Sequence, residues 1–229
     1  MNDHVRAKRV FVSTSTIIEC ASVDWRLFMK AIMFSNQKIG AILGVAAALL
    51  AGQASAAGYQ DATGTQPAGG NGWIDSASFE FGTGPKVRLA RIAVQKNWES
   101  RWFASNGRHL GGYWDLSAAY WRGTAYRNVP GQHQNLAVVG ITPVARYQRD
   151  DKLGWYVEGG IGANLFSELY NNDDNRLSTA FQFGDHVGVG YVTPTGWDLG
   201  AKIQHYSNAS IKRPNSGANF LVFGARYKF

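Results

Sequence analysis

His205 and Ser207 are the two residues of this sequence whose types and spacing suit nucleophilic chemistry. A serine hydroxyl is a weak nucleophile until a neighbouring base takes its proton, and histidine is the side chain that most often serves as that base. Residues two apart on a β-strand share one face and stand about 6.6 Å apart, so an imidazole ring can approach the hydroxyl. If this segment is a strand, the pair is the minimum of an activated serine nucleophile.

Apolar and polar residues alternate along the segment around the pair, as they do in a β-strand. Trp197, Leu199 and Ile203 share one face and oppose Asp198 and Lys202. Similar alternation, separated by joints rich in Gly, Pro, Asn and Asp, predicts eight strands and no convincing helix after residue 57. The predicted strands lie near 75–82, 86–98, 109–122, 134–148, 154–166, 179–193, 196–208 and 218–229. The fold class is therefore all-β, an eight-stranded antiparallel barrel.

Alternation alone does not say which face of the barrel is apolar, because a soluble barrel has its apolar row inside. Three features favour an apolar exterior, namely an export signal, strands of about ten residues or more, and aromatic residues near strand ends such as Trp155, Trp197 and Phe229. Such strands span a bilayer when tilted, and eight of them enclose an interior filled by side chains. We therefore expect a transmembrane barrel of the bacterial outer membrane that is not a pore. The predicted strand 86–98 fits neither face cleanly, which suggests a β-bulge.

The N-terminal region has the features of a secretory signal peptide. The apolar run 39–52 follows Lys30 and Lys38 and precedes the small-residue site Ala54-Ser55-Ala56. The run is shorter than the roughly 18 residues of a spanning helix. We expect 1–56 to be an N-terminal extension plus signal peptide, with translation starting at Met29 or Met33, and 57–229 to be the barrel.

The composition excludes several other functional classes. One cysteine, Cys20, excludes a disulfide framework, a thiolate zinc site and an iron–sulfur cluster, since each needs at least two. The net charge of +7 is spread out, with no run of more than two Lys or Arg residues, so no nucleic-acid partner is expected. The histidines and carboxylates show no metal-ligand spacing, and we expect no metal or other cofactor.

On an apolar-out barrel, His205 and Ser207 would both face lipid, because they share the row of Trp197 and Ile203. Polar groups that face lipid lack water partners, and ionisable ones are by default a functional hypothesis. The alternative is that both residues lie at the interfacial rim, where polar side chains are ordinary.

The residues that follow the pair favour a functional reading. The stretch from Ile203 to Gly217 contains H-x-S-N followed by P-N-x-G, and it resembles the active-site signature of the PagL family, the outer-membrane lipid A 3-O-deacylases. Weaker similarities extend over most of 57–229, at 111–115 with 120–121, at 158–162 and at 183–185. The resemblance implies an eight-stranded barrel whose hydrolytic site faces the bilayer.

The resemblance also implies roles for single residues. Ser207 would be the nucleophile and His205 the base, while Asn208 and Asn215 would occupy the oxyanion-hole positions. The alternative for both asparagines is a turn-forming role. The family's acid is expected fourteen residues after the histidine, where this sequence has Asn219, whose amide oxygen can accept a hydrogen bond from the ring but carries no charge.

Asp185 is the alternative acid. It lies on the apolar row of its predicted strand, and it comes opposite His205 only if the turn at 193–196 gives an odd-length loop, because an even one sends it inward. Asn219 is the better-supported of the two partners, since parity places it on the row of His205.

The remaining polar candidates have simpler explanations. We expect Glu158 to pair with an interior Arg or Lys and His186 to face the packed interior, while His109 and His133 lie near strand ends or loops. The acidic loop at Asp173-Asp174 is expected to be solvated, although it has the charge to meet the cations that bridge lipopolysaccharide.

Together with the parity argument, the resemblance implies an outer-membrane esterase that removes the 3-O-linked acyl chain of lipid A, with lipopolysaccharide and outer-membrane lipid as its partners and a homodimer as a possibility. Two alternatives stay open. One is a non-enzymatic eight-stranded barrel for adhesion or membrane integrity, and the other is a lipid A acyltransferase.

Overall fold

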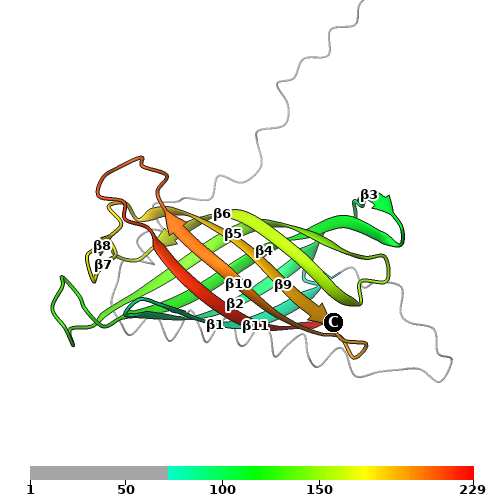
Figure 1. Ribbon diagram of the computed structural model, residues 1–229, viewed down its shortest axis with the longest axis horizontal. Coiled ribbons are helices and arrows are strands. Elements are labelled where there is room, and N and C mark those ends of the chain that lie inside the picture. Colours follow the sequence, from blue (N-terminus) through cyan, green and yellow to red (C-terminus); the bar gives the residue numbers. More distant parts are fainter. Residues whose placement is uncertain (1–71) are drawn as a thin grey trace, which may run out of the picture. The chain divides into compact units, whose positions relative to one another are not determined.

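The computed structural model describes residues 72–229, so the predictions for the signal peptide, the start site and Cys20 lie outside the described residues. Eight long strands form a closed antiparallel barrel (Figure 1). They are β1 (Ser76–Gly84), β2 (Val87–Asn97), β4 (Arg108–Gly123), β5 (Gln134–Arg149), β6 (Gly154–Phe166), β9 (Phe181–Val192), β10 (Trp197–Ser207) and β11 (Ala218–Lys228). Their order around the barrel is β2-β1-β11-β10-β9-β6-β5-β4, and pairing of β2 with β4 closes it.

All eight predicted strands are present, and their boundaries differ from the prediction by only a few residues. Three short strands were not predicted, β3 (Trp102–Ser105), β7 (Asn171–Asn172) and β8 (Asn175–Arg176). The prediction of a bulge in the second strand was wrong. β2 pairs in one continuous register with β1 and with β4, and its mixed appearance arises because inward positions carry Arg91 and Gln95 as well as Leu89.

The outside of the barrel is apolar and the inside is largely polar, as the export signal, the strand lengths and the aromatic residues near strand ends predicted. The exposed residues include Phe79, Ile161, Val187, Leu199 and Phe223, which belong to five different strands. Buried positions carry charge instead. An interior of this kind surrounded by an apolar wall is typical of outer-membrane barrels.

Ion pairs fill much of the interior. Arg91 contacts Glu80 at 2.9 Å and also pairs with Asp115. Arg146 contacts Glu158 at 2.7 Å and Asp198 at 2.8 Å, and all three side chains are nearly inaccessible to solvent. A buried charge is tolerated only when it is paired, so these contacts explain how a polar interior is stable.

One end of the barrel is closed by an aromatic cluster centred on Trp121, which is fully buried. The rings of Phe166, Tyr206 and Phe220 meet Trp121 edge-to-face at centroid distances of 4.5–4.9 Å. Tyr206 lies between His205 and Ser207 in sequence and points inward, so its packing anchors the end of β10 from inside. No helix in the described part of the chain is long and apolar enough to cross a membrane.

The two ends of the barrel differ in their connections. Segments 124–133, 167–180 and 208–217 emerge at one end, which we call the loop end (Figure 1). The opposite end carries the short turns 150–153 and 193–196 and the β3 hairpin. In outer-membrane barrels the long loops face the cell exterior and the short turns the periplasm.

Candidate active site

His205 and Ser207 lie on the outer face of β10, close to the loop end, and both are half-buried. Their neighbours on each side are fixed by the register of the sheet. His205 is opposite Asn219 on β11 and opposite Asp185 on β9. Residues directly opposite each other on antiparallel strands have Cα atoms about 4.5–5.5 Å apart. Both candidate partners of the histidine are therefore within reach of its ring, one on either side.

Of these two neighbours, Asn219 makes the contact. Its Oδ1 lies 2.7 Å from Nδ1 of His205. An amide oxygen only accepts hydrogen bonds, so Nδ1 of the ring donates, and the lone pair of the neutral imidazole is then on Nε2. This is the tautomer that a histidine needs when its Nε2 acts as a base.

Gly217 provides the surface on which the His205 ring rests. Its backbone has φ of +76°, and a Cβ built there would lie 2.6 Å from Cε1 of His205 and 3.4 Å from Nε2. Only glycine combines that backbone conformation with so close an approach. The glycine of the P-N-x-G segment thus sets the position of the ring, a role that the sequence did not indicate.

Ser207 is the last residue of β10 and pairs with Phe183 of β9. Among the described residues, the Ser207 hydroxyl makes no hydrogen bond, and in particular none to His205. Catalytic hydrogen bonds are often long before substrate binds, so the missing hydrogen bond between His205 and Ser207 is compatible with a nucleophile and its base.

The two asparagines of the motif differ in their surroundings. Asn208 is fully buried, and its side-chain NH₂ donates to the backbone oxygen of Lys212 at 2.8 Å and to Oγ of Ser178 at 3.3 Å. Its backbone N–H donates to Oδ1 of Asn215 at 3.0 Å. That last contact turns the Asn215 oxygen toward the loop, so its NH₂ group is the one left to donate. The geometry favours Asn215 over the Asn208 side chain as an oxyanion donor.

The loop 208–217 is held in place by the neighbouring loop 167–180. Leu177 forms a β-bridge with Asn215, and the N–H of Ser216 donates to the carbonyl oxygen of Arg176 at 3.0 Å. Ser178 Oγ donates to the carbonyl oxygen of Lys212 at 2.7 Å. Sequence reasoning missed this support, since no local pattern links two loops some forty residues apart.

The other polar candidates fall outside this arrangement. Glu158 pairs with Arg146, as expected, and His186 is buried with its Nε2 4.0 Å from Glu158. His109 contacts Asp150 at 2.9 Å, and His133 lies 3.2 Å from the carbonyl oxygen of Gly123.

The acidic loop is less free than expected. Asp173 contacts Lys86 at 2.6 Å, and Asp174 is hydrogen-bonded to Asn128. These contacts tie the loop 167–180 to its neighbours, so both carboxylates already have partners within the protein.

Comparison with known proteins supports a single family. The family model described as "Lipid A 3-O-deacylase (PagL)" matches residues 88–228. The lipid A deacylase PagL of Bordetella bronchiseptica is 30% identical over 159 residues, which are 66% of this chain and 82% of that protein. The protein of the same name from Pseudomonas aeruginosa is 32% identical over 136 residues, or 59% of this chain and 75% of that one.

A solved structure agrees with the sequence matches. The crystal structure of the outer-membrane enzyme PagL superposes with a TM-score of 0.58 at 25% sequence identity, and the match covers 67% of this chain and 99% of that one. The family model alone spans more than half of the present sequence. This outer-membrane β-barrel therefore belongs to the PagL family of lipid A 3-O-deacylases.

Proposed function

We propose that this protein hydrolyses the ester that links an acyl chain to the 3-position of lipid A, with Ser207 as nucleophile and His205 as base. The observation that carries the proposal is the His205–Asn219 hydrogen bond of 2.7 Å on the lipid-facing side of the barrel, beside Ser207. It leaves Nε2 of the ring as the basic nitrogen. A histidine held in one orientation on an otherwise apolar surface can act as a catalytic base if the substrate is itself a membrane lipid.

The reaction proceeds in two steps. Nε2 of His205 takes the Ser207 proton as Oγ attacks the ester carbonyl, and the same proton passes to the 3-hydroxyl oxygen of the sugar as the C–O bond breaks. Water then attacks the acyl-serine with His205 again as base, which releases a 3-hydroxy fatty acid and restores the serine. Asn215 donates its side-chain N–H to the negative oxygen of each tetrahedral intermediate.

Asn219 and Asp185 divide the role of the family's acid in this proposal. Asn219 orients the ring through Nδ1, but its amide is neutral. Asp185, on the other side of His205 and on the same outer face, supplies a negative charge near the imidazolium that forms during the reaction. The chemistry of all these groups is acid–base and nucleophilic, and the proposal includes no cofactor.

The position of the site on the barrel fits a lipopolysaccharide substrate. His205 and Ser207 lie near the loop end, which corresponds to the outer surface of the membrane, and lipopolysaccharide occupies the outer leaflet. An ester near the headgroup of such a lipid lies at the depth of the last residues of β10.

The test is the lipid A mass spectrum of cells that overproduce the protein, compared with cells that overproduce Ser207→Ala to the same level. Loss of one 3-hydroxyacyl mass only with the intact serine is the expected result. A heavier lipid A would indicate the acyltransferase instead. An unchanged spectrum with folded protein in the membrane would favour the non-enzymatic barrel.

Two further points stay proposals. We propose that signal peptidase cleaves after Ala56, in which case N-terminal sequencing of the membrane-embedded protein starts at Ala57. A homodimer is also a proposal, and cross-linking in native membranes would give a band at twice the mass of the barrel if it forms.

A further inference from the structure

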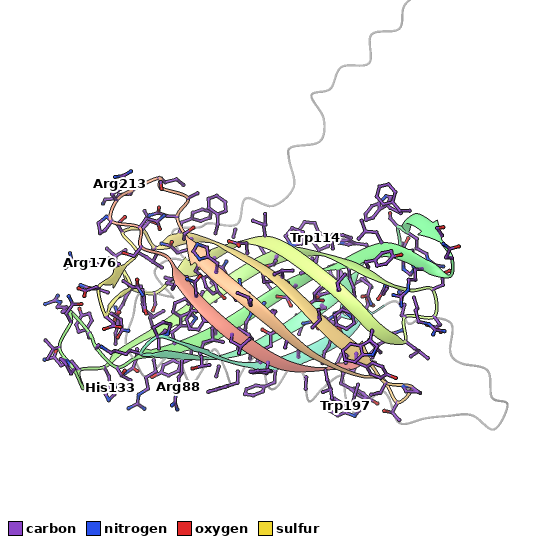
Figure 2. The ribbon with its side chains drawn as sticks, viewed as in Figure 1. Arg88, Trp114, His133, Arg176, Trp197 and Arg213 are labelled. Carbon is purple, nitrogen blue, oxygen red and sulfur yellow. The ribbon has the colours of Figure 1, made fainter. Side chains whose placement is uncertain are left out.

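A second polar feature lies on the outer face of the barrel, away from the candidate active site. Arg88 of β2 is directly opposite Arg122 of β4, and both side chains point outward and are exposed. Like charges directly opposite each other on neighbouring strands destabilise a sheet. Figure 2 shows Arg88 at the loop end, standing away from the barrel wall, with Trp197 at the opposite end.

No carboxylate compensates this pair within residues 72–229, because neither arginine takes part in a salt bridge or a side-chain hydrogen bond there. A second pair of opposed arginines makes the contrast clear. Arg108 and Arg149 face each other at the other end of β4 and β5, where Arg149 contacts Asp151 at 2.9 Å and Arg108 lies 5.8 Å from the ring centre of Tyr147. Within the described residues, one arginine pair has partners and the other has none.

The surroundings of Arg88 and Arg122 add a third polar side chain and an apolar wall below it. Asn135 of β5 lies opposite Arg122 on the same outer face. In the next row toward the middle of the membrane, Ala90 and Ala137 flank Tyr120 on either side. These apolar side chains continue the apolar outer wall directly below the polar group.

We propose that Arg88 and Arg122, together with Asn135, bind the phosphate monoester of an anionic lipid in the outer leaflet, whose acyl chains lie against the apolar wall below them. Guanidinium groups match phosphate oxygens in charge and in geometry, and the resulting hydrogen bonds are stronger than neutral ones. The phosphate neutralises the repulsion between the two arginines. The loop end is the level of the barrel at which lipid headgroups lie.

This lipid site is distinct from the hydrolytic one. Going around the barrel, β1 and β11 separate β2 from β10, so three inter-strand steps of about 4.8 Å give roughly 14 Å between the two sites along the wall. The binding site does not depend on Ser207 or His205, and its test needs no catalysis.

The experiment uses the purified, folded barrel in a nonionic detergent and counts bound lipids by native mass spectrometry. Phosphatidic acid is the probe, and phosphatidylcholine with the same acyl chains is the reference. The variant is Arg88→Gln/Arg122→Gln, and the matched control is Arg108→Gln/Arg149→Gln, which removes the same charge at the other end. We expect the variant to lose about tenfold in apparent affinity for phosphatidic acid, and the control to bind as the unmodified protein does.

The outcomes separate the alternatives. Equal binding by the variant and the unmodified protein, or an equal loss in the control, would overturn the proposal. Complete displacement of phosphatidic acid by an equal concentration of inorganic phosphate would show a free-phosphate site and overturn the assignment to a lipid. A lowered melting temperature of the variant in nonionic detergent would assign the arginines to folding, since removal of an unneeded repulsion leaves stability unchanged or raises it.

Discussion

The hydrogen bond between Asn219 and His205 gives the sharpest prediction, because one side chain there can be removed or given a charge. In Asn219→Ala the ring loses its acceptor at Nδ1. A neutral hydrogen bond contributes about 0.5–1.5 kcal/mol net, so we expect kcat to fall about tenfold. In Asn219→Asp a carboxylate takes the place of the amide. A charge-assisted hydrogen bond is about twice as strong, and we expect kcat to rise about tenfold above that of the unmodified protein.

The assay measures release of 3-hydroxy fatty acid from lipid A in detergent micelles, with kcat and KM determined separately. Both substitutions should act on kcat, since Asn219 orients the base and the proposal gives it no contact with the substrate. Leu221→Ala is the matched control, two residues further along β11 on the same exposed face, and it should leave kcat within about twofold. The melting temperatures of all variants show whether the barrel is intact.

Asp185 completes this experiment. Asp185→Asn removes the charge on the other side of His205 without changing the size of the side chain. When it is the only substitution, we expect a few-fold loss of kcat. The loss should be smaller in Asn219→Asp, where a second carboxylate is present. Full activity of Asn219→Ala together with an inactive Asp185→Asn would refute the assignment of Asn219 as the orienting residue, and full activity of both would remove both residues from the mechanism.

Further substitutions test the rest of the site and its support. Gly217→Ala places a methyl group 2.6 Å from Cε1 of His205, so activity should fall at least tenfold while the protein keeps the gel mobility of a folded barrel. Asn215→Ala should lower kcat about 10²–10³-fold, the usual cost of one oxyanion donor, whereas Asn208→Ala should mainly lower the melting temperature, because its NH₂ group is bonded within the loop. Arg146→Ala removes the arginine partner of Glu158 and leaves Asp198, among the described residues, only its 3.6 Å ion pair with Arg226, so it should destabilise the barrel by about 3–5 kcal/mol in urea unfolding. A change below about 1 kcal/mol would contradict the structural role of the interior ion pairs.

Much of the fold was predictable because a strand at a water-free surface must alternate. One face of each strand meets lipid and the other meets the polar interior, so the period of two, as in β6 and β10, located all eight strands and put His205 and Ser207 on the apolar row. The export signal, strand lengths and aromatic residues near strand ends then placed that row outside. The strand that appeared irregular was misjudged for a related reason. β2 has apolar residues on both faces, since Leu89 packs inside near the aromatic cluster while Ile92 faces outward, and alternation is weak there without any bulge.

The pairing between strands could not be predicted from the sequence and was determined only by the tertiary structure. The sequence by itself set the row of each residue, but whether Asp185 lies opposite His205 depended on the register across the 193–196 turn, which one residue more or less would have reversed. The partner of His205 was likewise settled by register, which brings residues fourteen apart along the chain into one hydrogen bond. The contact of Gly217 with the ring, the ties between the loops and the facing arginines on β2 and β4 have the same origin. Each joins segments that no local pattern relates, so only the closed barrel could determine them.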